Sequence, residues 1–154
     1  MRISLVAIGR SMPDWIEKGW NEYARRLPRA QIDLQLDALP APRGRRDGKG
    51  REREGRALLA RCPKPATVIA LDGIGEPWKT RALAKRLDEW MMRGSPVALL
   101  VGGADGLADE VRQASSACWS LGPLTLPHML VRVIVAEQIY RAWTLLSGHP
   151  YHRG

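Results

Sequence analysis

Three apolar runs, each followed by a turn rich in glycine or proline, constrain the fold of this chain most strongly. The runs are ATVIAL (66–71), PVALLV (96–101) and the shorter CWSLG (118–122), and the turns after them are DGIG (72–75), GGADG (102–106) and GPLTLP (122–127). A further apolar run, RISLVAIG (2–9), opens the sequence. Near-continuous apolar runs of this length are typical of strands that are buried on both faces, as in parallel sheets.

Helical patterns fill the intervals between these strands. We predict one helix from about Asp14, capped by Ser11 or Asp14 and ended by Pro28, a second over 79–92, and a long third one from Pro127 or His128 to Ser147. The first helix has one apolar face, formed by Trp15, Ile16, Trp20, Tyr23, Ala24 and Leu27.

Residues 31–39 alternate apolar and polar side chains, which predicts a strand near a sheet edge. Strands and helices therefore alternate along the sequence. This order predicts an α/β fold, a mostly parallel sheet flanked by helices, formed by one domain over 1–154.

The three glycine turns predict a ligand crevice. In an open parallel sheet the carboxyl ends of the strands share one edge, and ligands bind there. The sequence has neither GxGxxG nor GxxxxGK[ST], and 118–128 contains no Asp or Glu to hold a dinucleotide ribose. We therefore expect a flat, adenine-like group that is held mainly by backbone atoms. Each turn on its own is weak evidence and is typical of a simple chain reversal, so the crevice is predicted from the three turns together.

The predicted helix over 128–147 is apolar on nearly every side, so nearly every side must be buried. One face can pack on the sheet and another on a second subunit, which predicts a homodimer. Glu137 and Arg141 are four residues apart on this helix in the favourable order. They form either a structural ion pair or a charged pair that faces a crevice, a partner or a substrate.

Two of the three histidines lie in the last six residues, within GHPYHRG (148–154). Terminal segments usually fray, so this collection of imidazole, phenol and guanidinium groups is unusual. Gly148 and Pro150 stop the preceding helix and predict a short tail beside the glycine crevice.

The net charge of +8 and the isoelectric point near 10.2 favour a polyanionic partner such as RNA. Between Arg43 and Arg56 seven basic and three acidic residues form a loop that leads into a charged helix. The stretch 40–56 is either an RNA contact or a solvated surface loop.

No apolar run approaches the roughly 20 residues of a membrane span, and 1–15 lack the pattern of a secretory signal. Cys62 and Cys118 are far apart and form no CxxC motif, so we expect neither a disulfide framework nor a metal site. These features predict a cytoplasmic protein with reduced cysteines.

Several ordered motifs resemble one family over nearly the whole chain. TLPHMLVRVIVAEQIYRAW (125–143) with HPYHR (149–153), MPDW (12–15), LLVGGADGL (99–107) and SLGPLTLPH (120–128) resemble the RlmH family of ribosomal RNA large subunit methyltransferases, in the SPOUT class. The resemblance implies a C-terminal deep trefoil knot, a homodimer and S-adenosylmethionine as the methyl donor. It also implies N3 methylation of a pseudouridine in 23S rRNA (family target pseudouridine 1915) within the assembled 70S ribosome.

The resemblance also implies a cofactor pocket formed by Leu71, Gly102, Gly103, Leu121, Gly122, Pro123, Leu124, Thr125 and Leu126. N3 of pseudouridine must lose its proton, and histidine, with an ordinary pKa near 6.5, suits a base. We predict that His152, with Tyr151 and Arg153, lies beside the methyl group, and that Glu137 or Arg141 orients these groups. The tail completes either its own pocket or that of the partner subunit. His128 is expected as a helix cap or a pocket-wall residue.

Two other functions fit the same composition. A non-catalytic RNA-binding or ribosome-binding dimer would explain the charge and the apolar helix, although it leaves the glycine turns and the tail unexplained. Residue types do not exclude a SPOUT methyltransferase that acts on another RNA nucleotide, such as one in tRNA, because recognition of RNA shape leaves no short motif in the protein.

Overall fold

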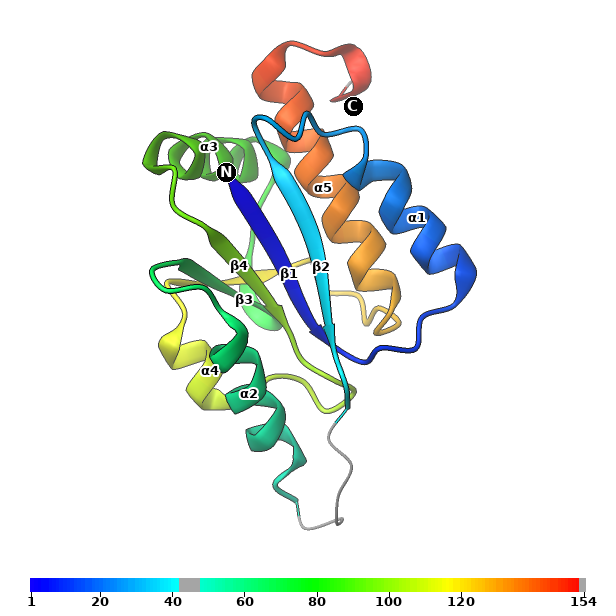
Figure 1. Cartoon of the computed structure of the whole chain (residues 1–154), viewed down its shortest axis with the longest axis vertical. Helices are drawn as coiled ribbons and strands as arrows, with labels where there is room; N and C mark the ends of the chain where they lie inside the picture. The colour runs from blue at the N-terminus through cyan, green and yellow to red at the C-terminus, as the bar shows by residue number, and fades with distance from the viewer. Residues whose placement is uncertain (42–47, 153–154) are drawn as a thin grey trace.

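The structure is a computed structural model that describes residues 1–41 and 48–152. Its sheet has the order β2-β1-β4-β3-β5, and every neighbouring pair of strands is parallel (Figure 1). The strands are β1 (Arg2–Ile8), β2 (Asp33–Leu39), β3 (Thr67–Pro77), β4 (Val97–Val101) and β5 (Ala117–Ser120). The predicted α/β fold with a parallel sheet is confirmed, and β2 is an edge strand as its alternating pattern predicted.

Helices cover both faces of this sheet. They are α1 (Asp14–Ala24), α2 (Gly50–Arg61), α3 (Thr80–Arg93), α4 (Asp109–Ala114) and α5 (Leu130–Ser147), followed by the short 3-10 helix η1 (Pro150–His152). In Figure 1, α2 and α4 lie together on one side of the sheet, and α5 packs alongside α1 on the other side, where it also contacts α3. This arrangement buries the sheet on both faces.

The side-chain alternation of β1 shows how the two faces are built. Ile3, Leu5 and Ala7 belong to the core beneath α1, α3 and α5, while Val6 and Ile8 belong to the core beneath α2 and α4. All five residues of β4, in the centre of the sheet, are buried. A strand with apolar side chains on both faces therefore indicates a central position in the sheet.

The predicted turn at 72–75 is wrong, because β3 continues through it to Pro77. The pairing with β5 shifts register between Leu71 and Glu76, so these residues form an irregular section of the strand. A Cβ atom on Gly75 would lie only 2.6 Å from the carbonyl oxygen of Cys118. Glycine is needed here because the β5 backbone passes so close, and not because the chain reverses.

The first helix also differs from its prediction. Pro13 occupies the N-cap position and no side chain caps the helix, whereas Ser11 or Asp14 was expected. Trp15, placed on the apolar face by its spacing, is 62% exposed in the protomer. The helix ends at Ala24 before Pro28 is reached.

The last helix begins at Leu130, two or three residues later than predicted, and ends as predicted at Gly148 in the left-handed conformation. Of the basic stretch, residues 42–47 lie outside the described part of the chain, and the charged helix that follows is α2. Across residues 1–41 and 48–152, no helix combines the length and the apolar character that crossing a membrane requires.

Candidate active site

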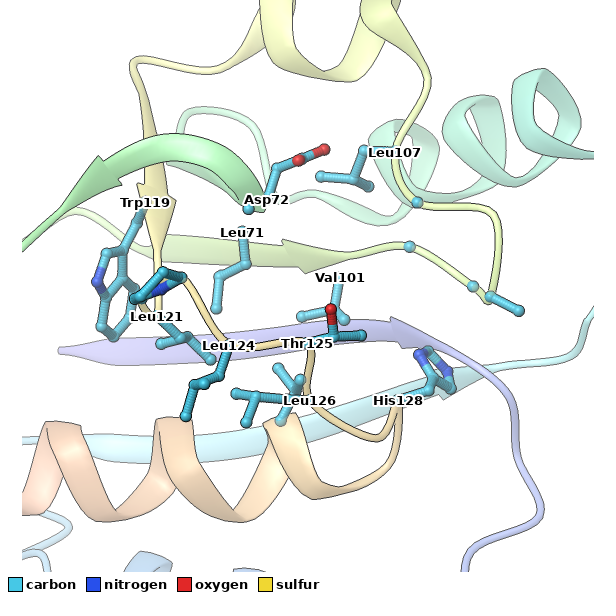
Figure 2. A pocket seen from close by; sticks show the side chains of 18 residues that line it. Leu71, Asp72, Val101, Leu107, Trp119, Leu121, Leu124, Thr125, Leu126 and His128 are labelled. Atoms are coloured by element: carbon cyan, nitrogen blue, oxygen red, sulfur yellow. The ribbon is translucent and has the colours of Figure 1, made fainter.

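A cavity of about 570 Å³ lies at the carboxyl ends of β4 and β5, beside the irregular section in the middle of β3. Three segments form it: the part of β3 with Asp72 and Gly73, the end of β4 with the 102–107 turn, and the loop that follows β5 (Figure 2). All nine residues predicted to bind the cofactor line this cavity, namely Leu71, Gly102, Gly103, Leu121, Gly122, Pro123, Leu124, Thr125 and Leu126. The nine residues therefore surround one cavity, and their contact with a cofactor stays a prediction.

The 102–107 turn is folded tightly upon itself. Gly106 donates its backbone N–H to the Gly103 carbonyl oxygen at 3.1 Å and has a positive φ of 78°. A Cβ on Gly102 would lie 2.5 Å from the Gly106 carbonyl oxygen, which is closer than real Cβ atoms approach. The GGADG motif thus encodes a turn that no side chain at position 102 would permit.

Apolar side chains form most of the remaining wall. Leu71, Val101, Leu107 and Leu126 face the cavity together with Trp119 (Figure 2). The Trp119 ring stacks on Trp78, with 5.3 Å between the ring centroids and 7° between the planes, and the Arg86 guanidinium lies 4.1 Å from the centre of the Trp78 ring. Sequence reasoning did not assign Trp119 to the pocket, because its position before the turn marks only a strand.

Asp72 supplies the carboxylate at the pocket wall. Arg112, on α4, donates to Asp72 Oδ2 and to the Leu107 carbonyl oxygen, both at 2.8 Å, and also pairs with Asp109. Asp72 Oδ1 accepts the backbone N–H of Ile74 at 3.2 Å. Arg112 therefore joins the β3 edge of the pocket to the 102–107 turn, a contact that no local motif in the sequence indicated.

His128 and Arg132 attach the end of the pocket loop to β1. His128 Nε2 lies 2.8 Å from the Ile8 carbonyl oxygen, and since a carbonyl only accepts, this nitrogen carries the proton. Arg132 Nη2 donates to the carbonyl oxygens of Ile8 and Gly9, at 3.1 and 2.6 Å. His128 is confirmed as a pocket-wall residue, while the N-cap position belongs to Met129.

The predicted catalytic residues on α5 and in the tail form a second cluster. Arg141 donates to Glu137 Oε1 through Nε at 2.9 Å and Nη2 at 2.6 Å, and the Tyr151 hydroxyl donates to the same oxygen at 3.0 Å. The Tyr151 ring packs on Tyr140 with 4.7 Å between the centroids. Burial and the neighbouring Glu137 carboxylate raise the pKa of Tyr151, so its phenol stays protonated at neutral pH.

His152 belongs to the same end of the molecule. Its Nδ1 is buried and has no hydrogen-bond partner in the structure. Arg153, the other terminal residue predicted to act in catalysis, lies outside the described residues.

In one protomer, η1 lies at the far end of α5 from the loop that leads into this helix (Figure 1). Val131, in the first turn, lines the pocket, whereas η1 follows the last turn. A helix of 18 residues is about 27 Å long. The expectation that the tail lies beside the crevice of its own chain is therefore wrong, because α5 runs away from the pocket. The alternative, a tail that completes the pocket of the partner, is compatible with this geometry.

The fold and the pocket at the strand ends define a SPOUT-type methyltransferase. The family described as "Predicted SPOUT methyltransferase" matches residues 1–152. Proteins named ribosomal RNA large subunit methyltransferase H are similar over 99% of this chain: those of Hahella chejuensis (49% identical, 99% of that protein covered), Pseudomonas aeruginosa PAO1 (51%, 100%) and Pseudomonas putida KT2440 (48%, 100%). The chain belongs to this ribosomal RNA large subunit methyltransferase H family.

Solved structures agree with the fold. A methylase family protein from Haemophilus influenzae matches with a TM-score of 0.55 and 14% identity, over 99% of this chain and 70% of that one. Another from Neisseria gonorrhoeae matches with a TM-score of 0.52 and 16% identity, over 90% and 81%. At these identities the likeness concerns the arrangement of the chain alone.

S-adenosylmethionine is the cofactor of this class, and the residues present fit it. The cavity has the size of a small-molecule pocket, apolar side chains can enclose the adenine, and the glycine turn brings backbone groups to its edge. Asp72, His128 and Thr125 are the polar side chains in this lining, which suits a cofactor with a cationic sulfur better than a polyphosphate. Within the described parts of the chain, no group of three or more His, Cys, Asp or Glu side chains could hold a metal ion.

Proposed function

We infer that the chain methylates N3 of a pseudouridine in 23S rRNA, the family target pseudouridine 1915, on the assembled 70S ribosome. The observation that carries this proposal is that all nine predicted cofactor residues surround one cavity in a chain about 50% identical to proteins named ribosomal RNA large subunit methyltransferase H. Bound S-adenosylmethionine supplies an electrophilic methyl carbon, whose bond to sulfur breaks as the bond to N3 forms.

The chain must then hold the nucleobase and accept the N3 proton. Tyr151 is a poor base, since its pKa is raised and its hydroxyl already donates to Glu137. His152 remains the candidate base, with Nδ1 free of any partner. Arg153 would stabilise negative charge on the uracil ring or bind phosphate, and Glu137 and Arg141 would orient the tail through Tyr151.

The active site in this proposal is shared by two subunits. Tail and pocket are separated by the length of α5 in one protomer, so a two-fold axis that sets two such helices in opposite directions would bring each tail to the other pocket. Half-buried side chains along α5, such as Leu130, Ile134 and Gln138, and the exposed Trp15 on the adjacent α1 offer a surface for this contact.

A deep trefoil knot belongs to the same proposal, within a single SPOUT domain over 1–154. After β5, at the edge of the sheet, the loop over 121–129 crosses the ends of β3 and β4 and reaches β1, where His128 bonds to Ile8. This crossing is the segment that would thread the knot. A crystal structure in which 121–152 can be drawn out without passing through another loop would contradict it.

The basic stretch 40–56 is assigned to RNA contact in this proposal. In its described part, Arg51 and Arg56 are exposed on α2, the helix that packs behind the pocket turn. Action on the ribosome would place the protein in the cytoplasm.

The nucleotide and the particle can be tested together. The protein is incubated with methyl-labelled S-adenosylmethionine and free 23S rRNA, 50S subunits or 70S ribosomes, and the labelled nucleotide is mapped. We expect label on one pseudouridine of 23S rRNA in 70S ribosomes. Label on another RNA would favour the alternative nucleotide, and absence of label from every particle would favour a non-catalytic RNA-binding dimer.

A further inference from the structure

The 102–107 turn of the cofactor pocket is held from behind by a side chain of α2. Gly103 donates its backbone N–H to Glu54 Oε2 at 3.3 Å, across 49 positions of sequence. A Cβ on Gly103 would lie 2.8 Å from Glu54 Oε1, so the carboxylate lies directly against this backbone. Gly103 lines the pocket, and Glu54 does not.

Close packing of α2 fixes the position of this carboxylate. A Cβ on Gly55 would lie 3.0 Å from Val111 Cγ2 and 3.2 Å from Ala108 Cβ, so α2 lies flush against the start of α4. Leu58, one turn further on, is fully buried. Glu54 is half-buried at this contact, whereas Glu52 on the same helix is exposed.

The turn has few other bonds that fix its first residues. Within the turn, Gly103 and Gly106 form an isolated antiparallel bridge, in which the Gly106 N–H donates to the Gly103 carbonyl oxygen. Glu54 gives the Gly103 N–H a charged acceptor from outside the turn. A hydrogen bond to a carboxylate is stronger than one to a neutral acceptor, and a backbone donor without a partner is costly where water is excluded. Without Glu54 the Gly103 N–H would lose its charged acceptor, so the peptide before Gly103 would be held less firmly at the edge of the pocket.

We propose that Glu54 is a positioning residue for cofactor binding, which acts through the Gly103 N–H and does not touch the cofactor. Through Glu54, the helix α2 would support the cofactor site, although no residue of α2 lines the cavity.

The test compares three variants by calorimetry with S-adenosylmethionine and with its thioether product. Glu54→Ala should raise both Kd values about tenfold, which corresponds to about 1.4 kcal/mol. Glu54→Gln keeps an acceptor oxygen and should stay within about threefold of the original Kd. Glu52→Ala, the matched control on the exposed side of α2, should leave Kd unchanged. At saturating cofactor, kcat of Glu54→Ala should fall much less than its cofactor KM rises.

Unchanged cofactor affinity in Glu54→Ala would overturn the proposal, and so would equal weakening in Glu54→Ala and Glu54→Gln. If Glu54→Ala does not fold, the proposal is tested instead by measuring hydrogen exchange of the Gly103 amide in the unaltered chain and in Glu54→Gln. The Gly103 amide should be protected in both, and exchange as fast as that of an exposed amide would overturn the role of Glu54.

Discussion

At the scale of single residues, Gly102 shows most directly how a backbone conformation shapes the cavity that we propose as the cofactor site. The position borders the cavity, and any Cβ there would collide with the Gly106 carbonyl oxygen. The requirement for glycine is therefore local and steric, and it is independent of the contacts that the cofactor itself makes.

Replacing this glycine should abolish cofactor binding. We expect Gly102→Val to raise the Kd for S-adenosylmethionine at least a hundredfold, which is about 2.7 kcal/mol, because the turn must open to admit the side chain. Isothermal calorimetry measures this change. Gly50→Val is the control, since a Cβ at position 50 meets no atom within 4 Å. Unaltered affinity in Gly102→Val would show that the cofactor binds elsewhere.

Tyr151 makes a contribution to stability that depends on pH. The pKa of Tyr151 is raised in the folded chain by burial and by Glu137, so the folded state favours the neutral phenol. The stability from this shift is fully present below the unfolded pKa of about 10 and is lost as the pH rises toward the folded pKa. Between pH 9 and 11, the Tm of the unaltered chain should therefore fall more than that of Tyr151→Phe. Parallel falls in the two proteins would contradict the assigned environment.

Single residues also mark where sequence reasoning stops. The nine pocket residues came from the resemblance to a family, and the glycine turns after the strands pointed to the same edge of the sheet; all nine line one cavity, while their role in cofactor binding stays a prediction. The partners that hold them could not be predicted: Glu54 and Arg112 reach the turn from helices whose packing no local pattern records. Trp15 has the spacing of a core residue, yet the protomer leaves it exposed.

At the scale of elements, α5 is attached to the sheet by a buried cation. Arg132 is fully buried, bonds to two carbonyl oxygens at the end of β1, and leaves Nε and Nη1 without partners. Burial lowers the pKa of Arg132, as expected where the charge is poorly solvated. The bonds of Arg132 and His128 nevertheless fix where the pocket loop ends and the helix begins.

Removing this attachment should destabilise the fold. We expect Arg132→Ala to lower the free energy of unfolding by about 3 kcal/mol, through the cavity left behind and the carbonyl groups left without a donor. Chemical denaturation measures the loss. Arg93→Ala, at an exposed position in the last turn of α3, should change stability by less than about 0.5 kcal/mol. A similar small change in Arg132→Ala would show that α5 is held by its apolar contacts alone.

The apolar pattern predicted which segments form strands and which form helices, but it did not always predict the residues at which these elements end. The pattern of β4 identified a central strand because both of its faces are buried. The continuation of β3 through 72–77 was not predicted because Gly75, a residue type that normally marks a turn, here allows the β5 backbone to pass close by. Here the tertiary contact with β5, and not the local glycine pattern, determines whether the segment is a turn or a strand.

At the scale of the whole molecule, one protomer keeps its tail and its pocket at opposite ends of α5. The sequence suggested both groups of residues, yet only the direction of α5 shows that one protomer cannot bring them together. Sequence periodicity cannot reveal this, because it describes which residues share a face of an element and not where the element points in space.

Deleting residues 151–154 should separate binding from chemistry. We expect the truncated chain to remain a dimer and to bind S-adenosylmethionine with unchanged Kd, because residues between Leu71 and Val131 of one chain line the cavity, and the partner's tail is proposed to act on the nucleobase. Methyl transfer should be lost. Light scattering, calorimetry and methyl transfer to 70S ribosomes measure the three properties, and normal turnover by the truncated chain would disprove catalysis by the tail.

The shared active site is tested most directly by a mixed dimer. Chains carrying Gly102→Val and chains lacking 151–154 are co-expressed with different affinity tags, and the heterodimer is isolated by sequential purification. Its two kinds of chain supply one intact pocket and one intact tail on opposite subunits. We expect homodimers of Gly102→Val and homodimers that lack 151–154 to be inactive. The heterodimer should have about half the activity of the unaltered dimer, because one of its two sites is complete. An inactive heterodimer would contradict a site completed by the partner.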